Sequence, residues 1–406
     1  MTPDAAGLRI CFVAREYPPV TSYSGGIGTH FAVLAPELAR QGHDVNVVTL
    51  DDSPVTDTRS SQVHLQLLRP PRTNRVRPLA NLEWSAAVDR ALRELGRFDV
   101  VYAAEWGGDA WRYAHHKHAG PLVTNLTSSY LLVLEGQDRQ RSLRGRLGLA
   151  TQGLLERRQA ERSDAIVACS HPVLDRLRRA WKIDDVPTAV LPNAVNIART
   201  RSLAATGEKP EGFPSSGPIV GFSGRLQSHK GVEELARAMR IVWDTYPDAQ
   251  LVMLGSDSGP SRARMSDVLR RHAGPYADRL HLPGHQPPER LFPALAAADV
   301  VALPSRWESF PIAALEAMAL QRPLVVTRGI GFDEFFEDGR DGLTVASRDP
   351  SALAAALLRL ISDDDLRRDC GERAGQTAER YDAPAVARMH ADYFAQVSAG
   401  HRPGPR

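Results

Sequence analysis

Segments of strand length alternate with longer segments of helical periodicity along this chain of 406 residues, and the alternation comes in two separate runs. Strands joined by helical crossovers pair in parallel, so this pattern predicts parallel sheets with helices on both faces. In the first run the predicted strands span residues 8–14, 45–50, 63–68, 98–103, 121–126, 165–169 and 188–191. In the second they span residues 219–223, 250–255, 279–282, 300–303, 324–327 and 343–345. The sequence therefore predicts an α/β fold with two doubly wound parallel sheets.

A segment rich in helix and strand breakers separates the two runs. Residues 207–218 contain three prolines and three glycines, a composition typical of loops. The chain is also longer than one hydrophobic core usually supports. We therefore expect an N-terminal domain at residues 1–200, a linker at 201–218, a C-terminal domain at 219–380 and a terminal helix at 381–406.

Two glutamates stand eight positions apart in the second run. Across residues 312–320 every residue except Glu316 is apolar. Such a helix is buried on nearly all sides, and a buried carboxylate without donors is costly, so Glu316 is predicted to need a donor-rich partner. Glu308 precedes this helix in a loop, with Ser309 as the predicted N-cap and Pro311 in the first turn. Because open parallel sheets bind ligands at the carboxyl ends of their strands, the pair predicts a binding site.

Two cations flanked by glycines lie upstream, between a predicted strand and a predicted amphipathic helix. Arg225 and Lys230 stand within the segment 224–231, which begins and ends with glycine. Glycine lets the backbone approach a ligand, and a helix start and basic side chains both attract negative charge. This arrangement favours a diphosphate site.

A third glycine-rich segment follows the first predicted strand. Gly25 and Gly26 belong to a fragment of a dinucleotide fingerprint, Gly-Gly-Ile-Gly. The loop before it is too long for the tight turn of a nicotinamide-binding site, so the sequence argues against such a site.

These motifs, at this spacing, resemble those of the retaining GT-B glycosyltransferases of group 1, family four, which use nucleotide-sugar donors. The resemblance covers nearly the whole chain and is densest between residues 219 and 345. It implies two Rossmann-like domains that face an interdomain cleft, with the acceptor bound by the first domain and the donor by the second. It also implies that the last helix returns to the first domain.

The resemblance assigns roles to particular residues. In the family's Glu-x7-Glu motif the first glutamate holds the donor sugar and the second the ribose, roles that would fall on Glu308 and Glu316. The family's diphosphate-binding arginine and lysine match Arg225 and Lys230, and these two with Glu308 are the expected catalytic residues. Many members have glycine in place of Pro311, which leaves the preferred donor open. The implied donor-binding set is Gly25, Gly26, Arg225, Lys230, Glu308, Ser309, Phe310, Pro311, Ile312 and Glu316.

The chain departs from the family after the predicted strand at 121–126. Members usually have a histidine there that touches the donor sugar, and this chain has none. Asn125 or Thr127 can supply a hydrogen bond but not a positive charge. The expected acceptor or sugar pocket consists of Glu105, Asn125, Thr127 and Tyr130.

The chemistry expected from these residues needs no metal. No Asp-x-Asp motif follows a strand of the first half, so Arg225 and Lys230 are predicted to neutralise the departing diphosphate of a UDP- or GDP-sugar. We expect no metal site and no cofactor besides this co-substrate. Two alternatives stay open: a nucleotide-sugar 2-epimerase, with Glu16, Glu105 or Asp109 as acid and base, and a non-catalytic nucleotide-sugar-binding protein.

Charge limits the possible partners. The net charge is +2, and no aromatic residue interrupts the arginine-rich segments 69–77 and 139–162, which argues against nucleic acid. Those arginines are either solvated surface or a docking site for an anionic acceptor. We expect the acceptor to be a small molecule, a glycan or a lipid-linked intermediate, with peripheral membrane contact as an open option.

Cysteine usage and hydropathy bear on the compartment. Cys11, Cys169 and Cys370 lack the spacing of metal ligands and are predicted to be buried thiols in a reducing environment. No apolar stretch has the length of a membrane span. We therefore expect a cytoplasmic protein of carbohydrate or glycoconjugate biosynthesis, in peripheral contact with the inner face of the membrane if its acceptor is lipid-linked.

Overall fold

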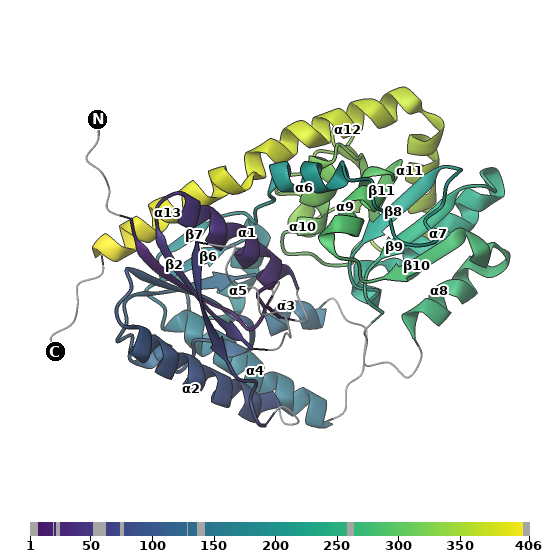
Figure 1. The fold of residues 1–406 in the computed structure, drawn as a ribbon. Helices are drawn as coiled ribbons and strands as arrows, with labels where there is room; N and C mark the ends of the chain where they lie inside the picture. Colours follow the sequence, from purple (N-terminus) through teal and green to yellow (C-terminus); the bar gives the residue numbers. More distant parts are fainter. Residues whose placement is uncertain are drawn as a thin grey trace, which may run out of the picture. The chain divides into compact units, whose positions relative to one another are not determined.

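The structure is a computed structural model that describes residues 7–18, 20–21, 25–51, 62–73, 77–127, 129–135, 143–257 and 264–400. The chain divides into two compact units, one of Met1–Ala194 with Ala383–Arg406 and one of Val195–Asp382. Each unit is built on one parallel sheet with helices packed against it, as Figure 1 shows. The predicted α/β fold with two doubly wound sheets is confirmed.

The first unit contains a seven-stranded sheet of order β3-β2-β1-β4-β5-β6-β7. Every pair of neighbours is parallel. Strand order reverses between β1 and β4, the switch point at which such sheets hold ligands. All seven predicted strands are present, with bounds that differ from prediction by two residues at most: β1 (Arg9–Val13), β2 (Asp44–Leu50), β3 (Val63–Leu68), β4 (Val100–Ala104), β5 (Leu122–Leu126), β6 (Ala165–Ala168) and β7 (Thr188–Val190).

Helices cover both faces of this sheet. On one face α1 (Gly26–Arg40) and α13 (Ala383–Gly400) pack over Phe12, and Phe31 and Phe394 are buried there. On the other, Trp84 of α2 (Arg77–Leu95) packs over Val13, and α4 (Leu143–Glu161) packs beside α2. The short helices are η1 (Trp106–Gly108), η2 (Tyr113–His115), α3 (Tyr130–Glu135) and α5 (His171–Ala180).

The second unit contains a six-stranded sheet of order β10-β9-β8-β11-β12-β13. Its strands are also parallel throughout. They are β8 (Ile219–Ser223), β9 (Gln250–Leu254), β10 (Leu280–Gly284), β11 (Val300–Leu303), β12 (Leu324–Thr327) and β13 (Gly342–Val345). The helices are α6 (Ile197–Ala204), α7 (Val232–Thr245), α8 (Met265–Ala273), α9 (Pro288–Ala296), α10 (Ile312–Ala319), α11 (Pro350–Ser362) and α12 (Asp364–Ala378), with the short helices η3 (Ser228–Lys230), η4 (Gly274–Arg279), η5 (Ile330–Phe332) and η6 (Glu379–Tyr381).

The chain passes between the units earlier than the predicted linker at 201–218. The boundary lies between Ala194 and Val195. Helix α6 follows at once and packs against α9 of the second unit, so the first part of the predicted linker is helical. The proline- and glycine-rich composition marks the loop that leads from α6 into β8, and composition alone does not locate the boundary. The first and last segments of the second unit lie side by side, because the Val195 N–H donates to the Tyr381 carbonyl at 3.0 Å.

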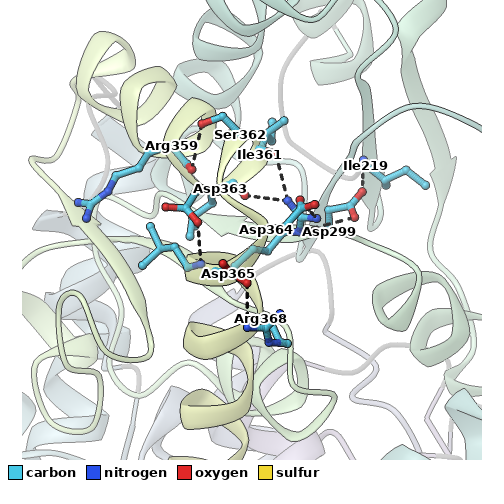
Figure 2. A network of polar contacts seen from close by, with 12 residues as sticks. Ile219, Asp299, Arg359, Ile361, Ser362, Asp363, Asp364, Asp365 and Arg368 are labelled. Atoms are coloured by element: carbon cyan, nitrogen blue, oxygen red, sulfur yellow. Dashed lines mark hydrogen bonds and ion pairs between the residues drawn. The ribbon is translucent and has the colours of Figure 1, made fainter.

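A polar network anchors α11 and α12 to the amino end of the second sheet (Figure 2). Asp299, just before β11, accepts the Ile219 N–H at 2.7 Å. Arg367 donates to the Leu360 and Ile361 carbonyls at 3.1 Å and to Asp364 at 2.6 Å. The contacts of Arg367 satisfy carbonyls in the last turn of α11. The loops described next lie at the opposite, carboxyl edge of the sheet.

Candidate functional site

The loops after β8 and β11 meet at the carboxyl edge of the second sheet, where these two strands are neighbours. Gly231 has a φ of 70°, and a Cβ there would lie 1.9 Å from the Pro304 carbonyl oxygen. Only glycine permits so close an approach. The Arg306 N–H donates to the His229 carbonyl at 2.7 Å, so the predicted cation loop and the predicted glutamate loop are joined by their backbones.

Lys230 and Glu308 form an ion pair. Lys230 Nζ lies 2.6 Å from Glu308 Oε1, and the side chains are only 22% and 11% exposed. Ser305 Oγ donates to the same oxygen at 2.7 Å. Lysine has three N–H donors, so two remain for a ligand. Two side chains predicted to hold different parts of one donor are therefore in direct contact before it binds.

A second ion pair joins the glutamate loop to helix α7, which directly follows the cation loop. Arg306 Nε and Nη2 lie 2.9 and 2.6 Å from Glu234 Oε1, on the first turn of α7. Both side chains are nearly buried. Sequence reasoning missed the Arg306–Glu234 pair because these two residues are distant from each other in the sequence. It also missed Ser305, which does not stand in a pattern typical of a site.

Arg225 lies half-buried in the cation loop as predicted, after Gly224. Gly224 has a φ of 147°, and a Cβ on Gly255 would lie 1.8 Å from its carbonyl oxygen. Burial, followed by the charge of Lys230, lowers the pKa of His229 to about 4; Arg225 and Arg306 act in the same direction and Glu308 opposes them.

Glu316 is the one polar side chain of α10, as predicted. The helix buries Ile312, Ala314, Leu315 and Met318. Burial raises the pKa of Glu316 to about 7, and the charge of Arg199 opposes this shift. No described residue donates a hydrogen bond to its carboxylate, so its acceptor capacity is unused within the described part of the chain.

Helix α10 begins later than predicted. Pro311 is its N-cap, with φ −76° and ψ 109°, and its carbonyl accepts the Ala314 N–H at 3.1 Å. The predicted N-cap at Ser309 is wrong because a residue before proline avoids helical geometry, which excludes Phe310 from the helix. Phe310 instead packs against Phe335, with ring centroids 4.9 Å apart.

In the first unit, Gly25 is the N-cap of α1 and donates its N–H to Glu16 Oε2 at 2.6 Å. A Cβ on Gly28 would lie 2.9 Å from Glu16 Cβ, whereas Gly26 has open space around it. A carboxylate of the protein thus lies at a helix start, a position that attracts anions. This packing requires Gly28, where a Cβ would also meet the Glu16 backbone; at Gly25 a Cβ would meet only the movable Glu16 carboxylate, and at Gly26 nothing within 4 Å.

The four residues of the predicted sugar pocket gather at the carboxyl ends of β4 and β5. Glu105 accepts the Thr127 N–H at 2.8 Å and the Thr127 hydroxyl at 3.3 Å. The Glu105 N–H donates to the Asn125 carbonyl at 3.1 Å, while Asn125 Nδ2 is buried without a partner. Tyr130 is buried close by in the chain, at the start of α3.

Glu156 of α4 also belongs to this network, and sequence reasoning missed it. It is fully buried and accepts the N–H groups of Gly107 and Tyr130 at 2.9 and 2.8 Å. Burial raises its pKa to about 8, although these hydrogen bonds oppose the shift. Because Glu156 precedes two arginines in a polar helix, the sequence resembles an exposed surface.

Asp109, a candidate acid or base for an epimerase, is engaged in a structural ion pair. Its Oδ1 lies 2.7 Å from Arg15 Nε, and burial raises its pKa to about 6 against the effect of Arg15. Glu16 in turn holds Gly25 at the start of α1. Both carboxylates thus have structural partners.

Comparison with known proteins identifies the family of the chain. Residues 206–377 match the family model described as Glycosyl transferases group 1, and residues 24–199 match Glycosyltransferase Family 4. D-inositol 3-phosphate glycosyltransferase of Acidothermus cellulolyticus is 31% identical over 389 residues, covering 88% of this chain and 82% of that protein.

Solved structures share the fold over nearly the whole chain. Sucrose-phosphate synthase from Thermosynechococcus elongatus superposes with a TM-score of 0.80 at 21% identity, covering 97% of this chain and 100% of that one. Anabaena HepE in complex with UDP-glucose superposes with a TM-score of 0.72 at 18% identity, covering 96% and 100%.

The fold and the family matches thus define a two-domain sugar transferase with GT-B architecture. The chain belongs to the group 1 glycosyltransferases. The resemblance inferred from the motifs is confirmed at this level. The three cysteines are buried and free, as predicted. Among the helices that the structure describes, none combines the length and apolar character that a bilayer crossing demands.

Proposed function

We propose that this glycosyltransferase moves a sugar from a UDP- or GDP-sugar to an acceptor hydroxyl, with retention of anomeric configuration and without a metal ion. The observation that carries the proposal is the contact of Lys230 with Glu308 at 2.6 Å on the carboxyl edge of the second sheet. A cation for a diphosphate and a carboxylate for sugar hydroxyls are there side by side. The complex of the structural neighbour HepE with UDP-glucose supports a nucleotide-sugar donor.

Each residue then has a distinct task. Lys230 and Arg225 neutralise the diphosphate as it departs, in the role that a metal ion has elsewhere. Glu308 accepts hydrogen bonds from the sugar, and Glu316 accepts them from the ribose. The Glu308 carboxylate and the Lys230 ammonium group are held in place before the nucleotide sugar binds. Little reorganisation of these groups should therefore accompany the reaction.

The acceptor is a small molecule, a glycan or a lipid-linked intermediate, bound by the first unit near Glu105, Asn125, Thr127 and Tyr130. Relatives act on a phosphorylated cyclitol according to their names, which supports a polyhydroxylated acceptor that carries an anionic group. Peripheral contact with an anionic membrane surface would bring a lipid-linked acceptor to this unit.

A donor panel tests the proposal. UDP-glucose, UDP-N-acetylglucosamine and GDP-mannose are incubated with and without acceptor extract, and nucleoside diphosphate release is measured. Release that depends on acceptor supports transfer, and NMR of the product reports the anomeric configuration. Conversion of the donor to an epimer, or binding without any release, would contradict it.

Metal independence has its own test. The enzyme is assayed with and without EDTA, and we expect activity to persist because Arg225 and Lys230 supply the positive charge. Activity lost with EDTA and restored by Mg²⁺ or Mn²⁺ would overturn the metal-free mechanism.

A further inference from the structure

Ser305 contributes a buried hydroxyl to the donor site, and nothing in the sequence motifs assigns it a task. It lies two residues after the end of β11 and is 1% exposed. Its Oγ donates to Glu308 Oε1 at 2.7 Å, the same oxygen that Lys230 Nζ approaches to 2.6 Å. Within the described residues no hydrogen bond reaches Glu308 Oε2.

We propose that Ser305 is a positioning residue that orients Glu308 toward the donor sugar, an inference that rests on the proposed function. With Oε1 held by two donors, rotation of the carboxylate would break a charge-assisted hydrogen bond. Oε2 is therefore presented in one direction, ready to accept a sugar hydroxyl. Lys230 alone cannot impose this orientation, because a flexible ammonium group follows the carboxylate as it turns.

The same geometry makes the contact with the diphosphate independent of the contact with the sugar. Lys230 reaches the diphosphate with N–H groups that Glu308 does not use, so the grip on the diphosphate does not need the Ser305 hydroxyl. Loss of that hydroxyl should weaken the sugar contact and leave the diphosphate contact intact. A serine that served stability alone would affect both ligands equally.

Four proteins and four ligands test the inference. Native enzyme, Ser305→Ala, Ser305→Thr and a control variant are titrated calorimetrically with UDP, UDP-glucose, GDP and GDP-mannose, and kcat and KM are measured with the active donor. For Ser305→Ala we expect kcat/KM to fall about tenfold, the effect of one hydrogen bond to a charged group, with the affinity for the nucleoside diphosphate within about twofold of native. Ser305→Thr keeps the hydroxyl and should recover most of the activity.

The control is Thr377→Val. Thr377 Oγ1 donates to Asp341 Oδ1 at 2.9 Å, another buried hydroxyl-to-carboxylate bond in the same unit. Asp341 directly precedes β13 and so lies at the opposite, amino edge of the sheet. This variant should lower thermal stability and leave the ratio of the two affinities unchanged.

The outcomes are distinct. Equal weakening of nucleoside diphosphate and nucleotide sugar in Ser305→Ala, or no change in either, overturns the positioning role. If Ser305→Thr does not fold, the affinity ratio in Ser305→Ala decides alone. A native protein that binds none of the four ligands overturns the proposed function itself, and the inference with it.

Discussion

Among single residues, Glu316, which we propose holds the ribose of the donor, is expected to reduce the stability of the ligand-free protein. Burial raises its pKa to about 7 from the ordinary value of 4.5. The folded protein therefore retains, between these two values, a proton that the unfolded chain releases, so the free energy of unfolding falls as pH rises through this window. We expect Glu316→Gln to raise the free energy of unfolding of the ligand-free protein at pH 8 by at most about 3 kcal/mol, and with it the Tm. At pH 5 the increase should be far smaller. Thermal unfolding at both pH values measures this, and equal shifts would contradict it.

The same substitution should weaken donor binding. A ribose hydroxyl that loses a charged acceptor loses about 1.5–3 kcal/mol, so the Kd for the nucleoside diphosphate should rise about tenfold or more. Calorimetry with UDP and GDP measures it. Unchanged affinity would remove Glu316 from the site.

Arg225 and Lys230 are expected to act mainly on the departing group. The diphosphate gains negative charge as it leaves, so contacts with fixed cations strengthen in the transition state. Replacement of either residue with alanine should lower kcat by roughly 10²–10³ and weaken ground-state donor binding less. Steady-state kinetics with each variant decide this, and a rise in KM at native kcat would show that these residues only anchor the nucleotide.

At the scale of elements, we expect α2 and α4 to be the part of the first unit that meets an anionic surface. They pack beside each other on one face of the first sheet, and Leu79, Leu82 and Leu154 are among the most exposed large apolar side chains described. Arg90 and Arg158 are exposed farther along the same helices. Apolar side chains flanked by cations are typical of membrane-surface helices.

We therefore expect binding to vesicles that contain anionic phospholipid and not to neutral vesicles. Leu79→Ser with Leu82→Ser should lower the partition coefficient about tenfold or more, because each leucine removes apolar area from water. The control is Ile241→Ser on α7, an apolar residue of the second unit that is exposed to a similar extent. Vesicle co-sedimentation at low and high salt measures it. Loss of binding in the control, or binding indifferent to lipid charge, would contradict the assignment to this face.

The elements themselves could be predicted because their signals are local. Apolar runs of strand length predicted which segments form the parallel strands and nearly their bounds, but not the order of the strands within each sheet, and glycine-flanked cations located the loop that holds Lys230. Contacts that depend on tertiary packing could not be predicted in this way. Glu156 lies in a polar helical sequence, and Arg306 finds Glu234 only because β8 and β11 are neighbours in the sheet. The start of α10 was misplaced because proline restricts the residue before it more strongly than serine favours a cap.

For the whole molecule, the course of the chain means that the first unit is completed by the last residues. The chain leaves this unit after Ala194 and returns at Ala383, so α13 joins a core formed by the first strands. Phe394 is fully buried, with its ring centroid 5.0 Å from that of Tyr102 on β4. His390 on the same helix packs against Tyr102 and against His30 of α1.

Phe394→Ala should therefore lower the free energy of unfolding of the first unit by about 3–5 kcal/mol, the cost of deleting a buried aromatic ring. Met389 lies on the same helix with 46% of its surface exposed, so Met389→Ala is the matched control and should change stability by no more than about 0.5 kcal/mol. Hydrogen exchange resolved along the chain distinguishes the units: exchange in β1 and β4 should accelerate in Phe394→Ala, while β8 and β11 keep their native rates. Faster exchange in β8 and β11 with no change in β1 and β4 would assign the terminal helix to the stability of the second unit instead.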